Sequence, residues 1–475
     1  MLHGGPAGAA GSRSGHGCVQ LFLRGARAPV PGSGGQGEWW TDAYVCAGPV
    51  RCFRGLARTR GWGSVAVSSR MNLNRSSRVR TRAIWVVRET CAHSTGNTWG
   101  AENLGGSTMH ILAVNAGAEV SGAERVLAEL LKTAVADGHR VTLLCPPGAL
   151  PESFGAGIVH VPVPLHRLGG ERGVRRLRAV ASLPRDWWRT ARRVRRAARG
   201  AEAVIVNSTF ALPAIGLAFP LHSLRPDRRP RVSWLVHDTI HSRKQRTALR
   251  LGAHALTVAV AVSQVTADSI RARVRRTVVR PNGVVVPEEM SGGTARVPGR
   301  PVAGILAVLT EWKGQDVLLE ALAQLPDVQL DIAGTAFPGS EEFERLLRAR
   351  AAQPDLAGRV HFLGHVDKRD VLPRWDVLVS ASTSPEAGPL GVLEAMAHGV
   401  PVVATDHGGA AEYLRGGAGI LVPPEDAPAL AEAIRTLLDD PVLARELRDT
   451  ARSAVLARHD AKTTVPAMLE ALSRG

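Results

Sequence analysis

From Met109 onward, short apolar runs alternate with longer stretches in which apolar residues recur every three or four positions. The apolar runs have the length of strands, and the periodic stretches have the pattern of amphipathic helices. We expect strands over 110–115, 140–145, 158–163, 203–207, 231–236 and 256–263, and helices over 122–137 and 174–199. Strands that are apolar throughout and alternate with helices are typical of a parallel sheet covered on both faces.

A segment rich in Pro, Gly and Ser interrupts this alternation at 278–301, and we interpret its later part as a linker. A second series then follows, with strands expected over 302–309, 328–333, 359–363, 377–380, 400–404 and 419–422, and helices near 314–325, 340–352, 389–398, 409–415 and 427–438. The sequence therefore predicts an α/β protein with two doubly wound, Rossmann-like domains facing each other across a cleft. The predicted domains are 109–282 and 302–475, joined by a linker at 283–301. The helices from 441 to 473 are expected to complete the second domain and can cross back to the first.

Residues 1–108 have a different pattern. They contain 19 of the 50 glycines, five of the ten tryptophans and four of the five cysteines, without helical periodicity or a strand–turn rhythm. Stretches such as 31–37 (PGSGGQG) and 51–60 (RCFRGLARTR) are typical of disordered or accidental sequence. Gly105–Gly106 implies GGN codons where a bacterial ribosome-binding site would precede Met109. We expect 1–108 to be a disordered or mis-annotated N-terminal extension, with a genuine basic tail as the alternative.

Composition excludes several classes of protein. With 45% hydrophobic and 21% charged residues, the chain is neither collagen nor coiled coil nor wholly disordered. No apolar run approaches the roughly 20 residues that cross a bilayer, and no secretory signal is recognisable. The five cysteines are scattered, and no two stand at metal-ligand spacing. We therefore expect no disulfide framework, no metal and a cytoplasmic location.

The most specific chemistry lies in 384–414. Glu386 falls in the loop after an expected strand, and Glu394 lies inside the following helix. Such loops, at the carboxyl ends of parallel strands, form the ligand crevice of doubly wound folds. The alternative is two surface acids that the helix dipole favours near a helix start.

The start of that helix is suited to an anion. Gly388 can cap the helix, and Pro389 suits its first position because that N–H would be unpaired anyway. The N–H groups of Leu390 and Gly391 would then point outward at the positive end of the dipole, ready for a diphosphate.

With its flanking residues, the segment SPEAGPLGVLEAMAHGVPVVATDHGGAAEYL resembles the signature of retaining glycosyltransferases of family 4, the large group 1 family. That signature is a Glu-x7-Glu pair followed by AMAxGxPVVAT and GGxxE, and the similarity extends over 109–475. The resemblance implies a GT-B type fold in which the second domain binds most of a nucleotide sugar and the first faces the acceptor. It implies that Glu386 hydrogen-bonds the donor sugar and Glu394 the nucleotide ribose. Gly408–Gly409 and Glu412 match GGxxE, where a turn is the plainer role.

Two further segments carry the resemblance. In TEWKGQDVLLEAL (310–322), Lys313 matches the lysine that neutralises the donor diphosphate, whereas the family's arginine position is Val308. In NAGAEVSGAERVLAELL (115–131), Gly122 matches the Gly-Gly-Ala-Glu-Arg loop beside the donor phosphates. Independently of any ligand, Ser121 and Glu124 are spaced as a capping box.

His237 in LVHDT ends an expected strand, and the resemblance places it beside the transferred sugar. A single histidine after a strand is more often structural. Asn282–Gly283 is most simply a turn at the domain junction, and the neighbouring Arg280 can reach a phosphate.

The expected helix 172–199 is strongly basic. Residues 167–199 contain 12 arginines against Glu171 and Asp186, with apolar residues at a period near 3.5. Pro184 is expected to kink or divide the helix. An anionic membrane surface on the inner face of the plasma membrane would suit such a helix, and a solvated arginine face with its apolar stripe on the sheet is the alternative. We expect no nucleic acid partner, because no recognition module is recognisable.

These features predict a bacterial hexosyltransferase that moves a sugar, with retention, from a nucleoside diphosphate sugar to an acceptor hydroxyl, including lipid-linked or cell-envelope acceptors. The nucleotide sugar is the substrate, and no cofactor is expected. His237, Glu386 and Lys313 are the expected catalytic residues. The expected donor-binding residues are Gly122, Lys313, Glu386, Gly388, Leu390, Gly391 and Glu394. The alternatives are a nucleotide-sugar epimerase of the same architecture and a membrane-binding protein with a vestigial site.

Overall fold

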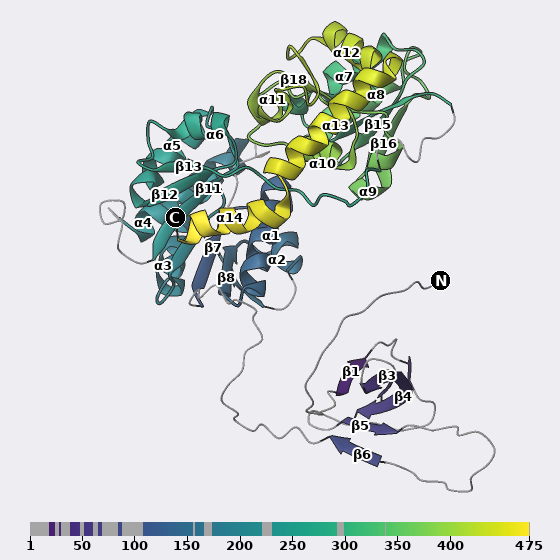
Figure 1. Ribbon diagram of the computed structural model, residues 1–475. Coiled ribbons are helices and arrows are strands. Elements are labelled where there is room, and N and C mark those ends of the chain that lie inside the picture. Colours follow the sequence, from purple (N-terminus) through teal and green to yellow (C-terminus); the bar gives the residue numbers. More distant parts are fainter. Residues whose placement is uncertain are drawn as a thin grey trace, which may run out of the picture. The chain divides into compact units, whose positions relative to one another are not determined.

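The computed structural model of the 475-residue chain describes strands within residues 19–87 and the segments 108–154, 157–165, 173–220, 230–291, 299–337 and 339–474. The chain divides into two compact units, Met1–Leu104 and Gly105–Gly475 (Figure 1).

The first unit contains an antiparallel sheet in the order β1-β3-β4-β5-β6, with β2 paired to β3. Its strands are Val19–Leu23 (β1), Ala28–Pro29 (β2), Trp39–Ala47 (β3), Cys52–Thr59 (β4), Val65–Ser68 (β5) and Ile84–Val87 (β6). The sheet differs from our expectation of irregular sequence, because β4 occupies most of 51–60. Short runs rich in β-branched and aromatic residues form strands when an antiparallel partner follows closely. Segments 31–37 and 105–106 lie outside the described residues, and the extension itself stays a prediction.

The second unit begins with a parallel sheet in the order β13-β12-β11-β10-β7-β8-β9. Its strands are His110–Val114 (β7), Arg140–Cys145 (β8), Ile158–Pro162 (β9), Ala203–Val206 (β10), Arg231–Val236 (β11), Val258–Ala261 (β12) and Thr277–Val279 (β13). The helices around it are Gly122–Ala136 (α1), Ala149–Glu152 (α2), Gly173–Ala197 (α3), Leu212–Ala218 (α4), Arg243–Gly252 (α5) and Gln264–Ile270 (α6). The central strands are buried on both faces, as their continuous apolar runs predict.

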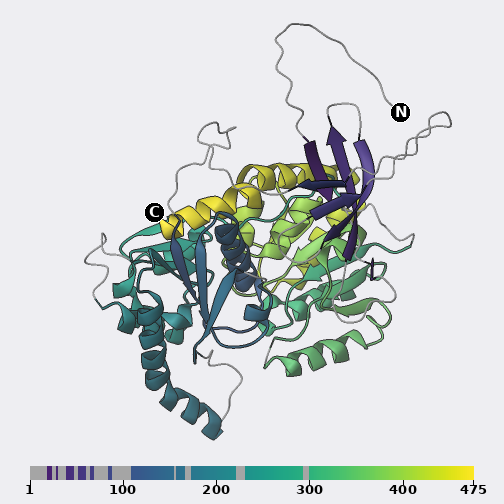
Figure 2. The ribbon, with the colours of Figure 1, turned by 90° about the horizontal axis from the view of Figure 1, so that it is seen from below.

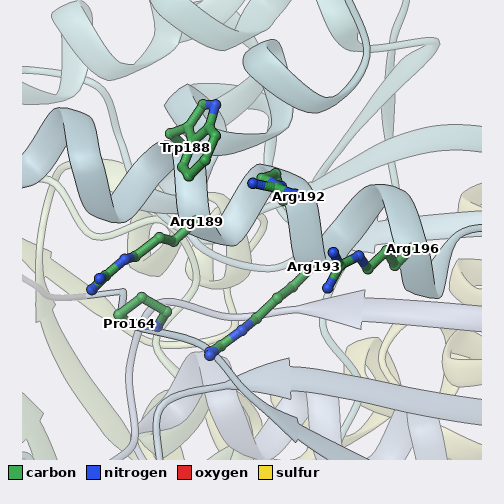
Figure 3. A pocket seen from close by; sticks show the side chains of 6 residues that line it. All are labelled: Pro164, Trp188, Arg189, Arg192, Arg193 and Arg196. Carbon is green, nitrogen blue, oxygen red and sulfur yellow. The ribbon is translucent and has the colours of Figure 1, made fainter.

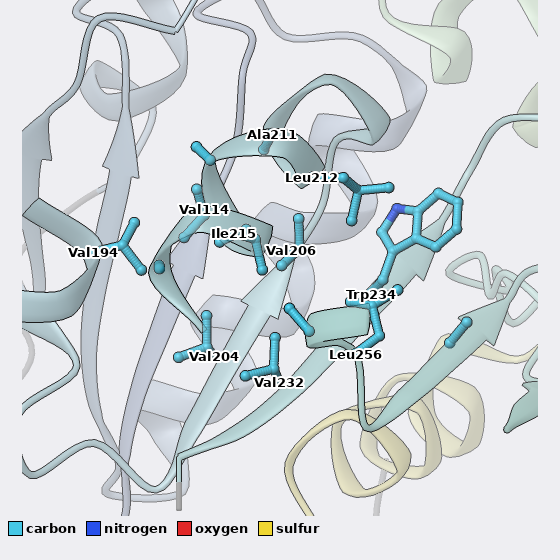
Figure 4. Packing of buried hydrophobic residues seen from close by; sticks show 14 of the residues in the cluster. Val114, Val194, Val204, Val206, Ala211, Leu212, Ile215, Val232, Trp234 and Leu256 are labelled. Carbon is cyan, nitrogen blue, oxygen red and sulfur yellow. The ribbon is translucent and has the colours of Figure 1, made fainter. Parts of the chain in front are cut away.

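The core of this sheet shows how the apolar runs are used. Residues from adjacent strands, among them Val206 and the fully buried Trp234, pack with Leu212 and Ile215 of α4 (Figure 4). Burying one such side chain stabilises the fold by roughly 1.5–3 kcal/mol. Loops at the ends of these strands are therefore attached to a rigid base.

A second parallel sheet has the order β16-β15-β14-β17-β18-β19. Its strands are Val302–Leu306 (β14), Gln329–Ala333 (β15), Val360–Gly364 (β16), Val377–Ser380 (β17), Val402–Thr405 (β18) and Ile420–Val422 (β19). The helices are Gln315–Ala323 (α7), Glu341–Ala351 (α8), Lys368–Val371 (α9), Leu390–His398 (α10), Gly408–Leu414 (α11), Ala427–Asp439 (α12), Pro441–Arg458 (α13) and Ala461–Ser473 (α14). Two Rossmann-like, doubly wound domains are thus confirmed.

Each sheet has one topological switch point, where the strand order reverses. In the first sheet it lies between β7 and β10, and in the second between β14 and β17. Ligands of open α/β folds bind outside the carboxyl ends of the strands at such points. The residues that follow these four strands are therefore the first place to look for a functional site.

The last helix leaves the second domain. α13 packs on α10, whereas α14 packs on α1 and on strands of the first sheet (Figure 1). Met468, Leu469 and Leu472 belong to the same buried cluster as Leu127 and Leu130 of α1. The C-terminal helices thus cross back to the first domain, so that α14 is packed with the first sheet although the predicted boundary gave it to 302–475.

The long basic helix α3 is continuous from Gly173 to Ala197, with Pro184 inside it. Pro184, which we expected to kink or divide the helix, does not divide it, because helical turns continue on both sides of the proline. Its C-terminal half is anchored by the buried Ala191 and Val194, whereas Leu177 and Val180 are exposed. The N-terminal part of α3 extends away from the sheet in Figure 2.

Candidate active site

The two loops at the switch point of the second sheet lie against each other. The loop after β14 forms the short 3-10 turn Glu311–Lys313, which ends at Gly314 with a φ of 66°. A Cβ atom at Gly314 would stand 2.0 Å from the carbonyl oxygen of Ala381, just after β17. Only glycine allows so close an approach at that φ. The N–H of Thr383 also donates to the carbonyl of Trp312 at 3.0 Å, so the two loops form one structure.

Lys313 and Glu386 form an ion pair across these loops, between Nζ and Oε2. Their side chains are only 14% and 10% exposed. The hydroxyl of Ser382 donates to the other carboxylate oxygen. Two charges so far removed from water need each other as partners. The structure therefore brings two of the predicted site residues into direct contact.

Glu394 lies inside α10 and is almost completely buried. Its carboxylate pairs with Nζ of Lys368 at 2.6 Å, and Lys368 is the first residue of α9, after β16. Asp367 caps α9 by accepting from the N–H of Arg369. This short capped helix is what directs Lys368 toward Glu394.

The N-terminus of α10 differs from the prediction by one position. Pro389 is the cap and Leu390 the first helical residue, because the ψ of Pro389 is 110°, outside the helical range. The N–H groups of Leu390 and Gly391 still belong to the first turn, which has no partners within the helix. Gly388 precedes them where a Cβ would stand 2.7 Å from the hydroxyl of Tyr413. Gly388 therefore lets the loop pack against α11.

The switch point of the first sheet carries a buried polar cluster. Asn115 follows β7, Asn207 follows β10 and His237 follows β11. Nδ2 of Asn115 donates to Glu124 at 3.2 Å, Nδ2 of Asn207 to Oδ1 of Asn115 at 3.1 Å, and Nε2 of His237 lies 3.1 Å from Oδ1 of Asn207. Glu124 also completes the predicted capping box with Ser121. Glu124 is fully buried. The same carboxylate therefore both caps α1 and belongs to the polar cluster.

His237 is a neutral group at physiological pH. Burial lowers the pKa of its imidazole to about 4, against the opposing effect of the nearby Asp238 and Glu124 carboxylates. Desolvation disfavours the charged form of a histidine. This side chain can therefore exchange hydrogen bonds with an uncharged ligand group without adding charge to the site.

The two domains meet at the predicted site residues. An ideal Cβ at Gly122, the first residue of α1, would lie 3.7 Å from Cδ1 of Leu390. The hydroxyl of Thr239 donates to the carbonyl of Pro385 at 2.9 Å, next to Glu386. Gly122 and the loop after His237 therefore face the loop that carries Glu386 and the start of α10.

Glu412 of the GGxxE segment also joins the domains. Its two carboxylate oxygens accept from the N–H groups of Gln264 and Val265, at 2.9 and 2.7 Å. These N–H groups begin α6, so the contact joins a negative charge to a helix N-terminus. Glu412 therefore does more than form a turn.

Two neighbouring positions, Val308 and Arg280, each have a hydrogen bond that involves a backbone carbonyl. Val308 is held by its carbonyl, which accepts from Nε2 of Gln315 at 2.9 Å. Arg280 is exposed, and its guanidinium donates to the carbonyl of Val279. Asn282 is buried, and its Nδ2 donates to the carbonyl of Gly388 at 3.1 Å, so the predicted turn contacts the loop before α10.

Across the described segments, no group of three or more His, Cys, Asp or Glu side chains is arranged to hold a metal ion. Among the helices of these segments, none has the length and apolar character needed to traverse a bilayer.

Sequence comparison covers both domains. Residues 288–454 match the model for "Glycosyl transferases group 1", and residues 120–286 match that for "Glycosyltransferase Family 4". The chain belongs to the group 1, family 4 glycosyltransferases.

Curated members of the family match parts of the chain. It is 33% identical over 151 residues to a lipopolysaccharide core biosynthesis mannosyltransferase, LpsB, of Rhizobium meliloti (30% of this chain, 43% of the relative). It is 36% identical over 197 residues to a phosphatidyl-myo-inositol mannosyltransferase of Mycobacterium tuberculosis (38% of this chain, 49% of the relative). The chain thus spans less than half the length of these relatives.

Solved structures share the whole two-domain fold. HepE of Anabaena, in complex with UDP and glucose, superimposes with a TM-score of 0.65 at 25% identity, covering 77% of this chain and 100% of that one. WaaG, a glycosyltransferase involved in lipopolysaccharide biosynthesis, superimposes with a TM-score of 0.56 at 16% identity, covering 77% and 100%. These likenesses agree with the GT-B type arrangement of two Rossmann-like domains.

Three residues of the site were missed from the sequence. Lys368 could have been found from the sequence, because it is the first residue of a short capped helix after a strand of the second sheet. Asn115 and Asn207 each directly follow an apolar strand, and parallel strands end at one edge of a sheet. Reading them as neighbours would have required the strand order, which places β10 beside β7.

Proposed function

We propose that this protein transfers a hexosyl group from a nucleoside diphosphate sugar to an acceptor hydroxyl, with retention at the anomeric carbon. The observation that carries the proposal is the Lys313–Glu386 ion pair, which lies at the switch point of the second sheet. Lys313 supplies a cation from one loop, and Glu386 supplies, from the other, a carboxylate that can accept hydrogen bonds from sugar hydroxyls. The UDP and glucose bound by the similar HepE support a nucleotide-sugar donor.

Each of the site residues is assigned to one part of the donor. Lys313 and the N–H groups of Leu390 and Gly391 neutralise the diphosphate, because a leaving phosphate needs fixed positive charge. Glu386 and His237 orient the sugar hydroxyls. Glu394 accepts from the ribose diol, exchanging its contact with Lys368 for that ligand.

The reaction then needs little chemistry from side chains. The bond between the anomeric carbon and the phosphate oxygen breaks, and the acceptor oxygen bonds to that carbon on the same face. By the family resemblance, the acceptor proton passes to the departing phosphate oxygen. Catalysis consists of positioning and electrostatic stabilisation, and domain closure is expected to hinge in 283–301.

A thermal-shift screen of the full chain with UDP-, GDP- and ADP-sugars tests donor binding. A donor at about 100 times its Kd stabilises the folded state by about 2.7 kcal/mol. Lys313→Met should abolish the shift, and the same substitution at the exposed Lys462 should leave it intact. An unchanged midpoint with every donor would favour the vestigial-site alternative.

Product analysis separates transfer from epimerisation. A transferase yields a new glycoside, whereas an epimerase yields an isomeric nucleotide or free sugar. The named relatives are transferases and lend the epimerase alternative no support. An isomeric nucleotide sugar formed without any acceptor would overturn the proposal.

A second proposal concerns the acceptor: α3 lies on an anionic membrane, on the inner face of the plasma membrane, and presents a lipid-linked acceptor to the site. Leu177, Val180 and Trp188 are exposed on this helix. An open pocket of about 500 Å³ is lined by Pro164, Trp188, Arg189, Arg192, Arg193 and Arg196 (Figure 3). Exposed apolar groups beside several arginines suit the interface between lipid headgroups and acyl chains. The alternative of a packed apolar stripe holds for the C-terminal half alone.

The pocket lies on the anchored C-terminal half of α3, but other side chains than the anchoring ones line it. Arg195 faces the body of the domain and donates to the carbonyls of Ala218 and Leu217. The guanidinium of Arg192 instead lies over the ring of Trp188, 4.7 Å from its centroid. Such a pair offers a lipid phosphate both charge and an apolar surface.

Co-sedimentation with vesicles tests this second proposal. The full chain should sediment with phosphatidylcholine–phosphatidylglycerol vesicles at low salt and remain behind with phosphatidylcholine alone. Changing Arg189, Arg192, Arg193 and Arg196 to Gln should release it. Changing the exposed Arg271, Arg273, Arg275 and Arg276 to Gln removes the same charge and should not. Equal binding by both variants would contradict a role for α3.

A further inference from the structure

A chain of hydrogen bonds runs through the first domain from Glu124 to His237. Its links are Glu124, Asn115, Asn207 and His237, and the first three side chains are at most 4% exposed. The transferase proposal uses only the last of them. That proposal assigns no ligand contact to the three buried links, so we ask what they do to His237.

The direction of each hydrogen bond follows from the first link. One oxygen of Glu124 accepts from the N–H of Ser121 at 3.2 Å, and the other lies 3.2 Å from Nδ2 of Asn115. Nδ2 of Asn115 also lies 2.9 Å from the carbonyl oxygen of Gly117, which can only accept. The NH₂ group must therefore face Gly117, and the carboxamide of Asn115 has one possible orientation.

The remaining links follow in turn. Since Oδ1 of Asn115 is an acceptor, Asn207 presents its NH₂ group to it, at 3.1 Å. Oδ1 of Asn207 must then face Nε2 of His237. An amide oxygen cannot donate, so Nε2 carries the hydrogen. A neutral imidazole with hydrogen on Nε2 has a bare lone pair on Nδ1.

Nδ1 of His237 is available to a ligand. Within the described part of the chain it has no hydrogen-bond partner, and the side chain of His237 is only partly buried. The low pKa of His237 agrees with a neutral ring. An acceptor nitrogen without a partner can receive a hydrogen bond from a hydroxyl, whereas it repels the oxygens of a carboxylate.

We propose that Asn115 and Asn207, held by Glu124, are positioning residues that fix His237 as the Nε2–H tautomer, so that its Nδ1 selects a donor sugar with a hydroxyl over the corresponding uronate. This inference rests on the proposed function, because it takes His237 to contact the donor sugar. The tautomer itself does not depend on that function and is measured separately.

Nitrogen-15 spectra of histidine-labelled full-length protein test the tautomer. The peaks of His237 are assigned by their loss in His237→Gln. The expected result is a protonated Nε2 and an unprotonated Nδ1, the latter well downfield. A protonated Nδ1 in the wild-type protein would overturn the proposal, whatever the activity.

Asn115→Leu tests the chain without touching His237. Asn207 then loses the acceptor that orients its amide, so both tautomers of His237 should be populated, a change of about tenfold in their ratio. Thr209→Val is the matched control, since Thr209 lies in the loop of Asn207 but donates to Asp238 at 2.8 Å. An unchanged tautomer in a folded Asn115→Leu variant would overturn the role of Asn115. Should that variant fail to fold, the wild-type spectrum still decides.

Activity provides the second readout. The preference in kcat/KM for the hydroxyl-bearing donor over its uronate should narrow by about tenfold in Asn115→Leu, because an Nδ1–H can donate to a carboxylate. If the tautomers shift while that preference stays constant, selection by Nδ1 is overturned, and the fixed tautomer stands. If no donor reacts with the wild-type protein, the proposed function fails, and the spectra still report on the hydrogen-bond chain.

Discussion

The two switch points of this molecule contain different kinds of side chain. In the first domain, Asn115 and Asn207 connect a buried Glu124 to a neutral His237. In the second, each of two carboxylates has a lysine of its own, Lys313 for Glu386 and Lys368 for Glu394. The same fold thus provides a fixed uncharged surface on one side and exchangeable charges on the other.

The difference teaches which part of a ligand each side can receive. In a buried cluster of amide side chains, only one arrangement satisfies every hydrogen bond, and the cluster is therefore rigid. A lysine that already pairs with a carboxylate can exchange it for a phosphate, since both partners are oxygen anions. A diphosphate therefore suits the second side, and an uncharged sugar suits the first.

The largest expected effect comes from breaking the charged side. Lys313→Met should lower kcat/KM at least about 100-fold, as for other lost donors to a developing anion. It should also lower the free energy of unfolding by about 3 kcal/mol, because Glu386 is left buried without its partner. Enzyme assays and denaturant titration measure the two effects.

Lys313→Met combined with Glu386→Gln separates those effects. The double variant should regain most of the lost stability, since no unpaired charge remains, but none of the activity. Recovery of activity along with stability would show that the pair is only structural.

The second effect concerns Glu394. Glu394→Ala should weaken nucleotide-sugar binding by about 10–100-fold, the equivalent of one or two hydrogen bonds to a charged group. Isothermal titration with the best donor of the thermal-shift screen measures the Kd. Lys368→Met is the companion variant, and a larger loss there than in Glu394→Ala would assign the ligand contact to the lysine.

The third effect concerns His237 and the pH dependence of the free energy of unfolding. Since the pKa of His237 lies at about 4 in the folded protein and near 6.5 when unfolded, the unfolded state takes up the proton first. Stability is therefore unaffected above pH 6.5 and falls as the pH drops from 6.5 to 4, by about 2–3 kcal/mol for this residue. His237→Gln should remove that part of the slope in denaturant titrations over this range. Equal slopes for both proteins would contradict a buried neutral His237.

The smallest effect tests the contact between the two sides. Glu412→Gln weakens a charge-assisted interaction with the first turn of α6 and should raise KM by severalfold, with kcat less affected. Steady-state kinetics measure the split. An unchanged KM would indicate that this contact does not contribute to closure over the donor.

The sequence predicted most strands of the two parallel sheets, because a strand buried on both faces is a continuous apolar run, but it missed the short β13 and the strands of the first unit. The resemblance to family 4 also predicted that Lys313 and Glu386 belong to one site, and both lie in loops after strands of one domain. The hydrogen-bond chain was beyond the sequence, because Asn115 and Asn207 are 92 residues apart and meet through strand order. The sequence also left open whether Pro184 kinks or divides the expected helix 174–199, and the structure has one continuous α3.

The crossing of α14 has a mechanical consequence. The chain passes between the domains twice, near Val284 and near Asp460, and the two passages are hydrogen-bonded side by side: the N–H of Val284 donates to the carbonyl of His459, and that of Ala461 to the carbonyl of Val284, each at 2.9 Å. Two parallel tethers resist twisting far better than one. The halves are thereby limited to swinging about a shared axis, and a fluorophore placed at the C-terminal end of α14 would report the movements of the first domain.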